Sequence, residues 1–394
     1  MTQFIPSSGL LLVDKPQGVT SHDVVSCARH LLHTKRVGHA GTLDPMATGL
    51  LIVGFGNATR LLNYMLGHNK TYEAIIRLGE ATTTDDADGE VLTQNNLQVG
   101  PGVIAKSPDD LLLALLSESN SCANSCDNSC ADSCADSCDT NLINQAFERI
   151  TQVIKENLTG KIMQAPTAFS AIKINGQRAY DLAREGKTVE LESREITISD
   201  FCVANPRISR GKSGRKVCDI TATVSCSSGT YIRALARDLG RLLGVGGHLI
   251  SLRRTSIGDF SVTDSRVLKL RAETREFTDR NGNLQKRAKA VTQADFDADN
   301  MLPNFCLNMM ETSEHTLPTI CISETQAQDL RFGRWISLEN TLDFAKYPAI
   351  AYASIENTNE YDVVAVVEQA KNSKTNQIKP IVVFPASQKT GKLY

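Results

Sequence analysis

The sequence predicts an α+β fold in two domains, a large N-terminal domain and a small C-terminal β-barrel. Three observations lead to this prediction. Segments with the period of a strand and segments with the period of a helix are mixed up to about residue 260. The chain has 394 residues, which is more than one hydrophobic core usually supports. Beyond residue 310 the pattern changes to short strands with a single helix, which is typical of a small barrel.

The first elements alternate between strand and helix. Gly9 to Asp14 has the apolar run of a buried strand, and Ser21 is expected to cap a helix that continues to Leu32. Leu50 to Phe55 is a second apolar strand, and Lys70 to Leu78 alternates between apolar and polar residues. The residues expected on its buried face are Tyr72, Ala74, Ile76 and Leu78.

A second strand and helix follow after residue 215. Cys218 to Cys226 alternates as a strand, and Thr230 to Leu243 has helical spacing with Gly244 as the stop. Opposite its apolar side this helix carries a stripe of three arginines, Arg233, Arg237 and Arg241. Spacing alone favours a solvent-facing stripe.

Composition divides the rest of the chain. Residues 119–140 place five cysteines at a spacing of four among Ser, Asn, Asp and Ala: Cys122, Cys126, Cys130, Cys134 and Cys138. We expect a disordered, low-complexity insertion. The alternative is a metal site, although structural zinc sites usually have separated Cys-x-x-Cys pairs. Residues 266–310 are polar and charged and are expected to form a linker or insertion, which leaves domains of residues 1–265 and 311–394.

Basic residues are concentrated in two segments although the net charge is -2. Residues 207–216 contain five cations and no acid, and residues 266–289 contain eight cations and three acids. Such segments could form a local surface for nucleic acid. The alternative is a solvated loop.

The N-terminus lacks the charged and apolar regions of a signal peptide, and no segment approaches the roughly 20 apolar residues that span a bilayer. We therefore expect a cytoplasmic protein that does not associate with a membrane and whose cysteines stay reduced.

Asp44 is expected on an irregular loop between residues 36 and 45. The loop glycines permit tight turns, and Pro45 disfavours helical geometry at Asp44. Catalytic groups concentrate on loops that rigid elements hold. Taken alone, however, an Asp-Pro pair is more often only a turn.

The segment Gly-His-Ala-Gly-Thr-Leu-Asp-Pro-Met-Ala-Thr-Gly, residues 38–49, resembles the signature loop of the TruB family, the bacterial tRNA pseudouridine-55 synthases. Further segments resemble motifs of this family in the same order: Leu12 to His22, Lys70 to Ala74, Gly229 to Leu235 and Leu252 to Thr255. The segment from Gln164 to Lys173 departs slightly, since Ala165 and Phe169 stand where the family commonly has Pro and Tyr.

The resemblance implies a pseudouridine synthase fold, with a mixed, largely antiparallel sheet flanked by helices, as the catalytic domain in residues 1–265. It implies a PUA-like RNA-binding module in residues 311–394. The implied activity is conversion of uridine 55 in the T arm of tRNA to pseudouridine by base flipping. This isomerisation changes neither redox state nor composition, so no cofactor and no metal are expected. A covalent and a glycal route both stay open.

The resemblance also implies site residues. Asp44 is expected to be the catalytic nucleophile, and Arg233 to form an ion pair that keeps the Asp44 carboxylate charged. Tyr72 is expected to stack on the flipped base, and a role in proton transfer is left open. Substrate-binding roles are implied for His39, Tyr231, Leu252 and Lys15. For these four a structural role is the alternative.

The expected partner is the T-arm stem-loop of tRNA, bound by a monomer without a guide RNA. Two alternatives remain, a non-catalytic tRNA-binding or folding protein and a guide-RNA-dependent pseudouridine synthase relative. The combination of Asp44, Tyr72 and Arg233 favours an active enzyme. The absence of an extended basic tail favours the stand-alone form.

Overall fold

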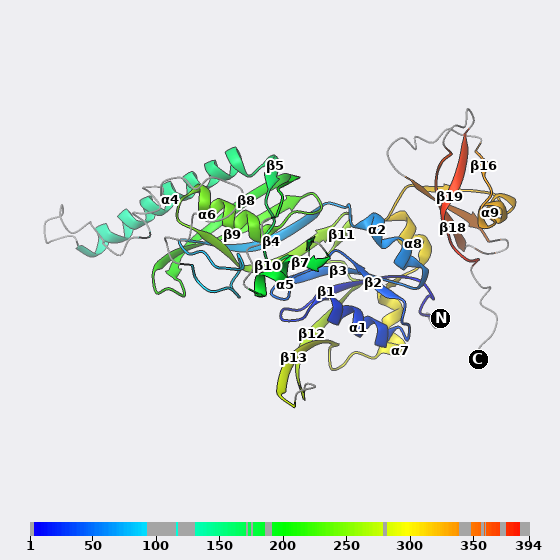
Figure 1. The fold of residues 1–394 in the computed structure, drawn as a ribbon, viewed down its shortest axis with the longest axis horizontal. Coiled ribbons are helices and arrows are strands. Elements are labelled where there is room, and N and C mark those ends of the chain that lie inside the picture. The colour runs from blue at the N-terminus through cyan, green and yellow to red at the C-terminus, as the bar shows by residue number, and fades with distance from the viewer. Residues whose placement is uncertain are drawn as a thin grey trace. The chain divides into compact units, whose positions relative to one another are not determined.

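A computed structural model describes residues 4–92, 116, 131–170, 172–174, 176–185, 191–278, 282–338, 348–355, 358, 360–370 and 376–386. The chain divides into two compact units (Figure 1). Unit 1 comprises residues 1–45, 49–67 and 259–394, and unit 2 comprises residues 46–48 and 68–258. The predicted domain boundaries at residues 265 and 311 stay predictions. Helices and a large mixed sheet confirm the predicted α+β class.

Strand β1 (Gly9–Lys15) is the centre of the sheet in unit 1. It pairs antiparallel with β3 (Thr48–Phe55) along its whole length. It also pairs in parallel with β12 (Val267–Thr278) and antiparallel with β14 (Cys306–Leu307). Strand β2 (Val37–Ala40) pairs with β3. Because β1 has partners on both sides, four of its residues, Leu10 to Val13, are fully buried.

Helix α1 (Ser21–Leu31) packs its apolar face against this sheet. Val24, Val25 and Ala28 join the core that β1 and β3 supply. The sequence predicted Ser21 as the cap, but the N-cap is Thr20. Thr20 has extended backbone geometry and its side chain accepts from the Asp23 N–H, while Asp23 accepts from the Thr20 N–H.

Residues 266–310 differ from the expected linker or insertion. Strand β12 pairs with β13 (Leu284–Thr292) as a hairpin, and α7 (Ala298–Met301) and the 3₁₀ helix η4 (Leu302–Phe305) follow. The apolar residues of this segment enter the core of unit 1: Leu268, Leu270, Ala290 and Leu302. These buried residues stand among many charged ones, which is why the sequence indicated a polar linker. A strand pair needs only one buried face to pack against a core.

The C-terminal strands form a separate five-stranded sheet in the order β15-β17-β18-β19-β16. Their bounds are β15 (Thr319–Cys321), β16 (Ile336–Ser337), β17 (Ala349–Ser354), β18 (Tyr361–Gln369) and β19 (Gln377–Val383). Helix α8 (Met309–Glu314) precedes them, and α9 (Glu324–Arg331) begins at the predicted cap, Ser323. This small sheet with one packed helix fits the predicted PUA-like module.

The sheet of unit 2 is antiparallel. Its order is β10 (Gly247–Ile257), β4 (Lys70–Leu78), β9 (Lys216–Cys226), β8 (Arg194–Arg210) and β5 (Gly160–Gln164). The predicted alternation of β4 is confirmed, since Tyr72, Ala74, Ile76 and Leu78 are buried. Helix α6 (Ile232–Leu242) lies against β10 and β4.

The smaller elements complete the chain. Unit 1 also contains η1 (Gly56–Arg60), α2 (Leu62–Met65) and β11 (Phe260–Ser261), and unit 2 contains β6 (Lys173–Ile174), β7 (Gln177–Arg178) and α5 (Ala179–Arg184). Helix α4 (Ala131–Asn157) includes the end of the predicted disordered insertion, so residues 131–140 are helical. Cys122, Cys126 and Cys130 lie outside the described residues. Within the described part of the chain, every helix is too short or too polar to cross a membrane.

Candidate functional site

Asp44 lies on an irregular loop, as the sequence predicted, but the loop is shorter than expected because Val37–Ala40 form strand β2, which the loop joins to β3. The loop leaves β2 at Gly41, whose φ of +86° is a conformation that favours glycine. The Leu43 side chain is buried beside it, and Asp44 itself is half-buried. The carboxylate therefore stands on a short, anchored loop rather than on a free turn.

Backbone hydrogen bonds hold this loop on both sides of Asp44. The Ser21 hydroxyl accepts from the Leu43 N–H at 2.9 Å and donates to the Leu43 carbonyl at 3.2 Å. The Gly18 N–H donates to the Pro45 carbonyl at 2.8 Å. Ser21 can do this because Thr20 takes over the capping of α1. No sequence pattern indicated this role for Ser21.

Lys15 is fully buried beneath the same loop. Its Nζ donates to the carbonyls of Val19 at 2.8 Å, Pro16 at 3.0 Å and Pro45 at 3.4 Å. These contacts give Lys15 a structural role in holding the loop, which the sequence had left as the alternative to substrate binding. A direct contact between Lys15 and substrate stays a prediction.

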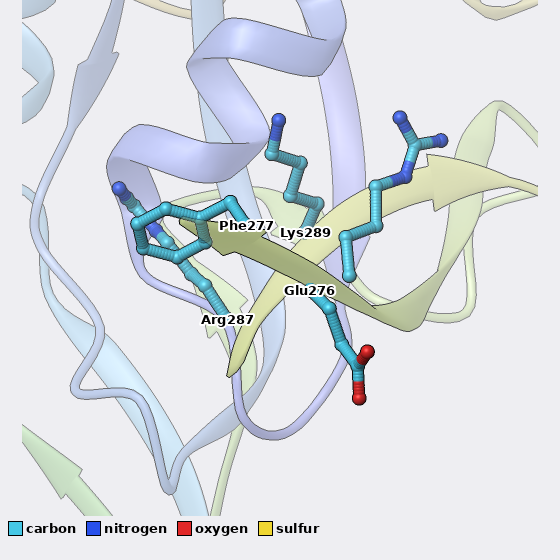
Figure 2. Close-up of a pocket in the computed structure, with 5 residues that line it drawn as sticks. Glu276, Phe277, Arg287 and Lys289 are labelled. Carbon is cyan, nitrogen blue, oxygen red and sulfur yellow. The ribbon is translucent and has the colours of Figure 1, made fainter. Parts of the chain in front are cut away.

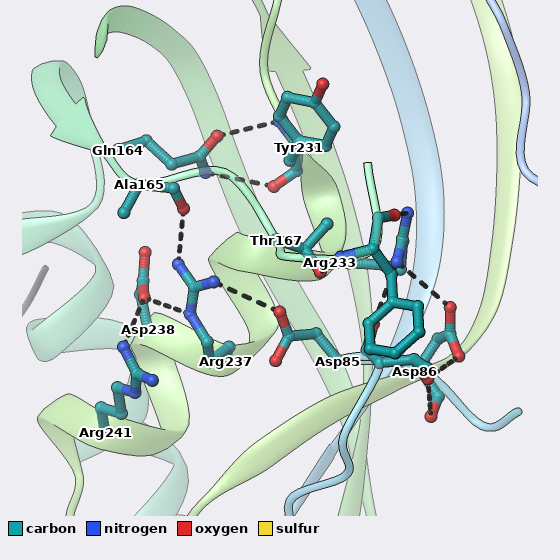
Figure 3. Close-up of polar contacts among 12 residues, drawn as sticks. Asp85, Asp86, Gln164, Ala165, Thr167, Tyr231, Arg233, Arg237, Asp238 and Arg241 are labelled. Carbon is teal, nitrogen blue, oxygen red and sulfur yellow. Dashed lines mark hydrogen bonds and ion pairs between the residues drawn. The ribbon is translucent and has the colours of Figure 1, made fainter. Parts of the chain in front are cut away.

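The other predicted site residues lie on regular elements. His39 is half-buried on β2, opposite Val53 of β3. Tyr72 and Leu252 are buried on the neighbouring strands β4 and β10. Tyr231 is the residue before α6, and its backbone N–H and carbonyl are both bonded to the Gln164 side chain, at 2.9 and 3.1 Å (Figure 3).

Arg233 is buried in unit 2 and held by three groups. Its guanidinium donates to the carbonyls of Thr84 at 3.0 Å and Phe169 at 2.9 Å. An ion pair joins it to Asp86 at 3.5 Å, with both side chains less than a tenth exposed. The contact with Phe169 uses its carbonyl, so the loss of the family's tyrosine hydroxyl at this position leaves that bond in place.

Arg237 and Arg241, the other members of the stripe, are mostly covered rather than solvent-facing, with side chains 11% and 13% exposed. Arg237 bonds to Asp238 at 2.9 Å, to Asp85 at 3.2 Å and to the Ala165 carbonyl at 2.7 Å (Figure 3). Arg241 lies 4.0 Å from Asp238. The loops around residues 85 and 165 cover this side of α6, which its spacing could not show.

The charges of this cluster depend on one another. Burial raises the pKa of Asp85, and the Arg237 charge and a hydrogen bond from Thr167 oppose that shift. Burial acts to lower the pKa of Arg237, but Asp238 and Asp85 raise it more. Arg237 therefore keeps its positive charge within the cluster. Asp85 also has a φ of +61°, a strained conformation for a residue other than glycine.

Asp86 is the ion-pair partner of a predicted site residue, Arg233, and the sequence did not single it out. Its side chain ends in the polar turn after β4, where it also accepts from the Asp88 N–H at 3.1 Å. The run of aspartates after a strand was a visible signal. Its arginine partner, however, is 147 positions away, a separation that no local pattern bridges.

Asp44 belongs to unit 1, whereas Tyr72 and Arg233 belong to unit 2. The predicted Asp44–Arg233 ion pair and the stacking role of Tyr72 stay predictions. In the described part of the chain, His, Cys, Asp and Glu side chains form no group of three that could hold a metal ion.

Two family models match this chain. A model described as TruB family pseudouridylate synthase (N terminal domain) matches residues 29–105 and 128–232, and one described as tRNA pseudouridylate synthase B C-terminal domain matches residues 233–286. The chain belongs to the TruB family. The gap between the first two ranges, residues 106–127, includes Cys122 and Cys126, so part of the cysteine repeat lies outside the TruB model.

Relatives of this TruB-family chain are similar over two thirds to nearly all of its length. The tRNA pseudouridine synthase B of Bifidobacterium longum subsp. infantis is 43% identical over 96% of this chain and 98% of the relative. The tRNA pseudouridine synthase B of Arthrobacter sp. is 38% identical over 98% of this chain and 99% of the relative. That of Thermobifida fusca is 46% identical over 66% of this chain and 73% of the relative.

Solved structures share the fold. The crystal structure of a Cbf5-Nop10-Gar1 complex contains a chain 20% identical, with a TM-score of 0.54 over 98% of this chain and 89% of that one. The structure of an H/ACA RNP bound to a substrate RNA containing 2'-deoxyuridine contains a chain 20% identical, with a TM-score of 0.53 over 96% of this chain and 85% of that one. At this identity the likeness concerns the fold alone, and it confirms the predicted fold class.

Proposed function

We propose that this protein is a tRNA pseudouridine synthase that converts uridine 55 in the T arm of tRNA to pseudouridine. The observation that carries the proposal is the near full-length identity to proteins named tRNA pseudouridine synthase B, 38% to 43% over 96% to 98% of this chain. The anchored carboxylate of Asp44 supplies a chemical group suited to this reaction.

The reaction breaks the bond from ribose C1′ to uracil N1 and forms a bond from C1′ to C5. The C5 proton leaves and a proton is gained at N1, so atoms and electrons balance without an added reagent. The Asp44 carboxylate attacks C1′, adds to the base or assists a glycal route, and all three routes require it beside the target uridine. The hydrogen bonds to Leu43 and Pro45 limit its movement and so favour one attack geometry.

Arg233 keeps the Asp44 carboxylate ionised in a site that excludes water. Asp86 and the carbonyls of Thr84 and Phe169 fix the guanidinium, which prevents it from turning to other anions. Tyr72 stacks on the flipped base, and Leu252 on the neighbouring strand lines its pocket. His39 occupies the space that the base leaves, and Tyr231 contacts the substrate from the start of α6.

The substrate is free tRNA, recognised by its T-arm stem-loop without a guide RNA. We place the protein in the cytoplasm as a monomer. The C-terminal sheet acts as a PUA-like RNA-binding module.

The test is to incubate the purified protein with unmodified tRNA alone and to map pseudouridine by mass spectrometry. Wild type is expected to modify position 55. Asp44→Asn is expected to slow the reaction at least about a thousandfold while tRNA affinity changes little. Asp299→Asn, which removes an exposed carboxylate of α7, is the matched control and is expected to retain activity.

Three outcomes would contradict the proposal. Near wild-type activity of Asp44→Asn would remove Asp44 from the reaction. Tight tRNA binding by wild type without modification would indicate a non-catalytic tRNA-binding protein. Activity that requires an added guide RNA would indicate the guide-dependent relative.

A further inference from the structure

The outer part of the β12–β13 hairpin extends beyond the sheet of unit 1 as a two-stranded ribbon (Figure 1). Strand β12 pairs with β1 only from Val267 to Lys269, whereas β12 and β13 pair with each other as far as Thr278 and Leu284. From residue 271 outward on β12, and from 284 to 289 on β13, every described residue is exposed or half-exposed. Strand β13 also contacts helix α1, but the side chains of the outer ribbon remain accessible to solvent.

The ribbon is basic in a chain that is slightly acidic. Strands β12 and β13 carry six cations and two carboxylates, against a net charge of -2 for the whole chain. Arg275 and Arg287 are directly opposite each other in the strand register. Each is bonded to a carboxylate, Arg275 to Glu273 at 2.7 Å and Arg287 to Asp23 at 2.8 Å, yet both arginine side chains stay more than half exposed.

An aromatic ring lies among these cations. Phe277 is 46% exposed. It lines an open hollow of about 350 Å³ together with Arg275, Glu276, Arg287 and Lys289. Figure 2 shows Phe277, Arg287 and Lys289 extending from one side of the ribbon while Glu276 extends from the other. One face therefore combines an accessible ring with cations.

This combination fits RNA better than an acidic protein. Surfaces that bind unpaired nucleotides place aromatic rings for the bases beside cations for the phosphates. An acidic protein would use the cations but gives no reason for an exposed phenylalanine between them. Lys289 is exposed, and the carboxylate opposite it in the strand register, Glu273, is bonded to Arg271 and Arg275.

The ribbon is connected to the loop of Asp44 by a short series of contacts. Arg287 bonds to Asp23 at 2.8 Å. Asp23 forms the capping box of α1 with Thr20. Ser21, which follows Thr20, is hydrogen-bonded to the backbone of Leu43, the residue before Asp44. Because all these contacts lie in unit 1, an RNA bound to the ribbon lies on the same rigid elements that hold Asp44.

We propose that Phe277, Arg287 and Lys289 form a second RNA-contact surface for the tRNA substrate. An unpaired base stacks on Phe277, and the two cations bind the adjoining phosphates. The identity of the RNA as tRNA rests on the proposed function, whereas the surface itself rests on the ribbon.

The test measures the affinity of the full chain for an unmodified tRNA transcript at several salt concentrations. Phe277→Ala is expected to weaken binding about fivefold or more, whereas Phe277→Trp keeps the affinity because it keeps a stacking ring. Lys289→Ala is expected to reduce the slope of log affinity against log salt by about 0.7 to 0.9. Lys286→Ala is the control, since Lys286 is exposed on the same strand but bound to Glu276 at 3.0 Å.

Wild-type affinity in both Phe277→Ala and Lys289→Ala would overturn the proposal. An equal loss of affinity in Lys286→Ala would also overturn it, because it would indicate diffuse electrostatic attraction. So would competition in which polyglutamate displaces tRNA from wild type but not from the ribbon variants, because it would indicate that the surface binds an acidic protein. If the Phe277 and Lys289 effects are found but wild type forms no pseudouridine, the surface is supported and the proposed function alone fails.

Discussion

The arginine cluster around α6 and the β12–β13 ribbon use the same residue types for opposite purposes. The Arg237 side chain is 11% exposed and bonds to two carboxylates and a carbonyl, whereas the Arg275 side chain is 55% exposed and bonds to Glu273. In the cluster, arginines cross-link backbone segments that are distant in sequence. On the ribbon, their charge stays accessible. Burial, more than composition, decides whether an arginine cross-links the fold or leaves its charge accessible to solvent.

The largest expected effect comes from breaking the buried side of this comparison. Arg237→Leu leaves Asp85 and Asp238 without their main cation, so the free energy of unfolding is expected to fall by about 4 kcal/mol. Urea denaturation followed by circular dichroism measures it. Adding Asp85→Asn should restore part of the lost free energy of unfolding, since it removes one buried carboxylate that has lost its cation. A loss below about 1 kcal/mol would mean that the cluster does not cross-link the fold.

Arg233→Lys tests whether buried geometry matters beyond charge. One ammonium cannot reproduce the planar contacts to Asp86 and the two carbonyls, so the proposed partner of the Asp44 carboxylate would no longer be held in one geometry. The single-turnover rate of pseudouridine formation is expected to fall about a hundredfold with tRNA affinity unchanged. A wild-type rate would show that charge alone suffices at this position.

The pair Arg77–Asp219 lies between the two extremes of burial. Two bonds of 2.7 Å join the groups, and the side chains are 15% and 14% exposed. Burial acts to raise the pKa of Asp219, but hydrogen bonds from Arg77 and Ser209 outweigh it, and the pKa lies below its usual 3.8. The stabilisation is therefore present above pH 3.8 and is lost as the pH falls through the lower, folded-state pKa.

Asp219→Asn is expected to lower the free energy of unfolding by about 2 kcal/mol at pH 7, with a discount for partial exposure. The difference from wild type should shrink as the pH falls below 3.8. Denaturation curves at several pH values measure it. A difference that is independent of pH would assign the effect to packing.

The smallest effect is expected on the exposed side. Arg275→Ala removes an ion pair with Glu273 in which the arginine is more than half exposed. The free energy of unfolding should change less than in Asp219→Asn, and the change should decrease with added salt. Thermal melts at low and high salt measure it. A loss of the size expected for Arg237→Leu would erase the distinction between the two regions.

The sequence predicted the elements whose signal is local. The strand periods of β1, β3, β4 and β9, the stop of α6 and the loop position of Asp44 are all confirmed. Each depends on neighbouring residues, so its pattern can be read from a short window. The roles of the site residues came only from resemblance, and they stay predictions.

Features that depend on distant partners were missed. Capping was expected of Ser21, but Thr20 caps α1 and leaves Ser21 to hold a loop 22 positions away. The arginine stripe looked solvent-facing because the loops that cover it come from elsewhere in the chain. The β12–β13 hairpin looked like a linker because its core contacts are to β1 and α1, more than 200 residues earlier.

The position of β1 has a consequence for how the protein is made. Its partner β3 is synthesised within 40 residues, but its parallel partner β12 begins at Val267. At about 5 to 20 residues per second, a ribosome needs roughly ten to fifty seconds to reach it. During that time one edge of a mostly apolar strand has no hydrogen-bonding partner in β12, while nearly all of unit 2, residues 68–258, is synthesised. The enclosed unit is therefore expected to fold first on the ribosome, and the unit that carries Asp44 to close last.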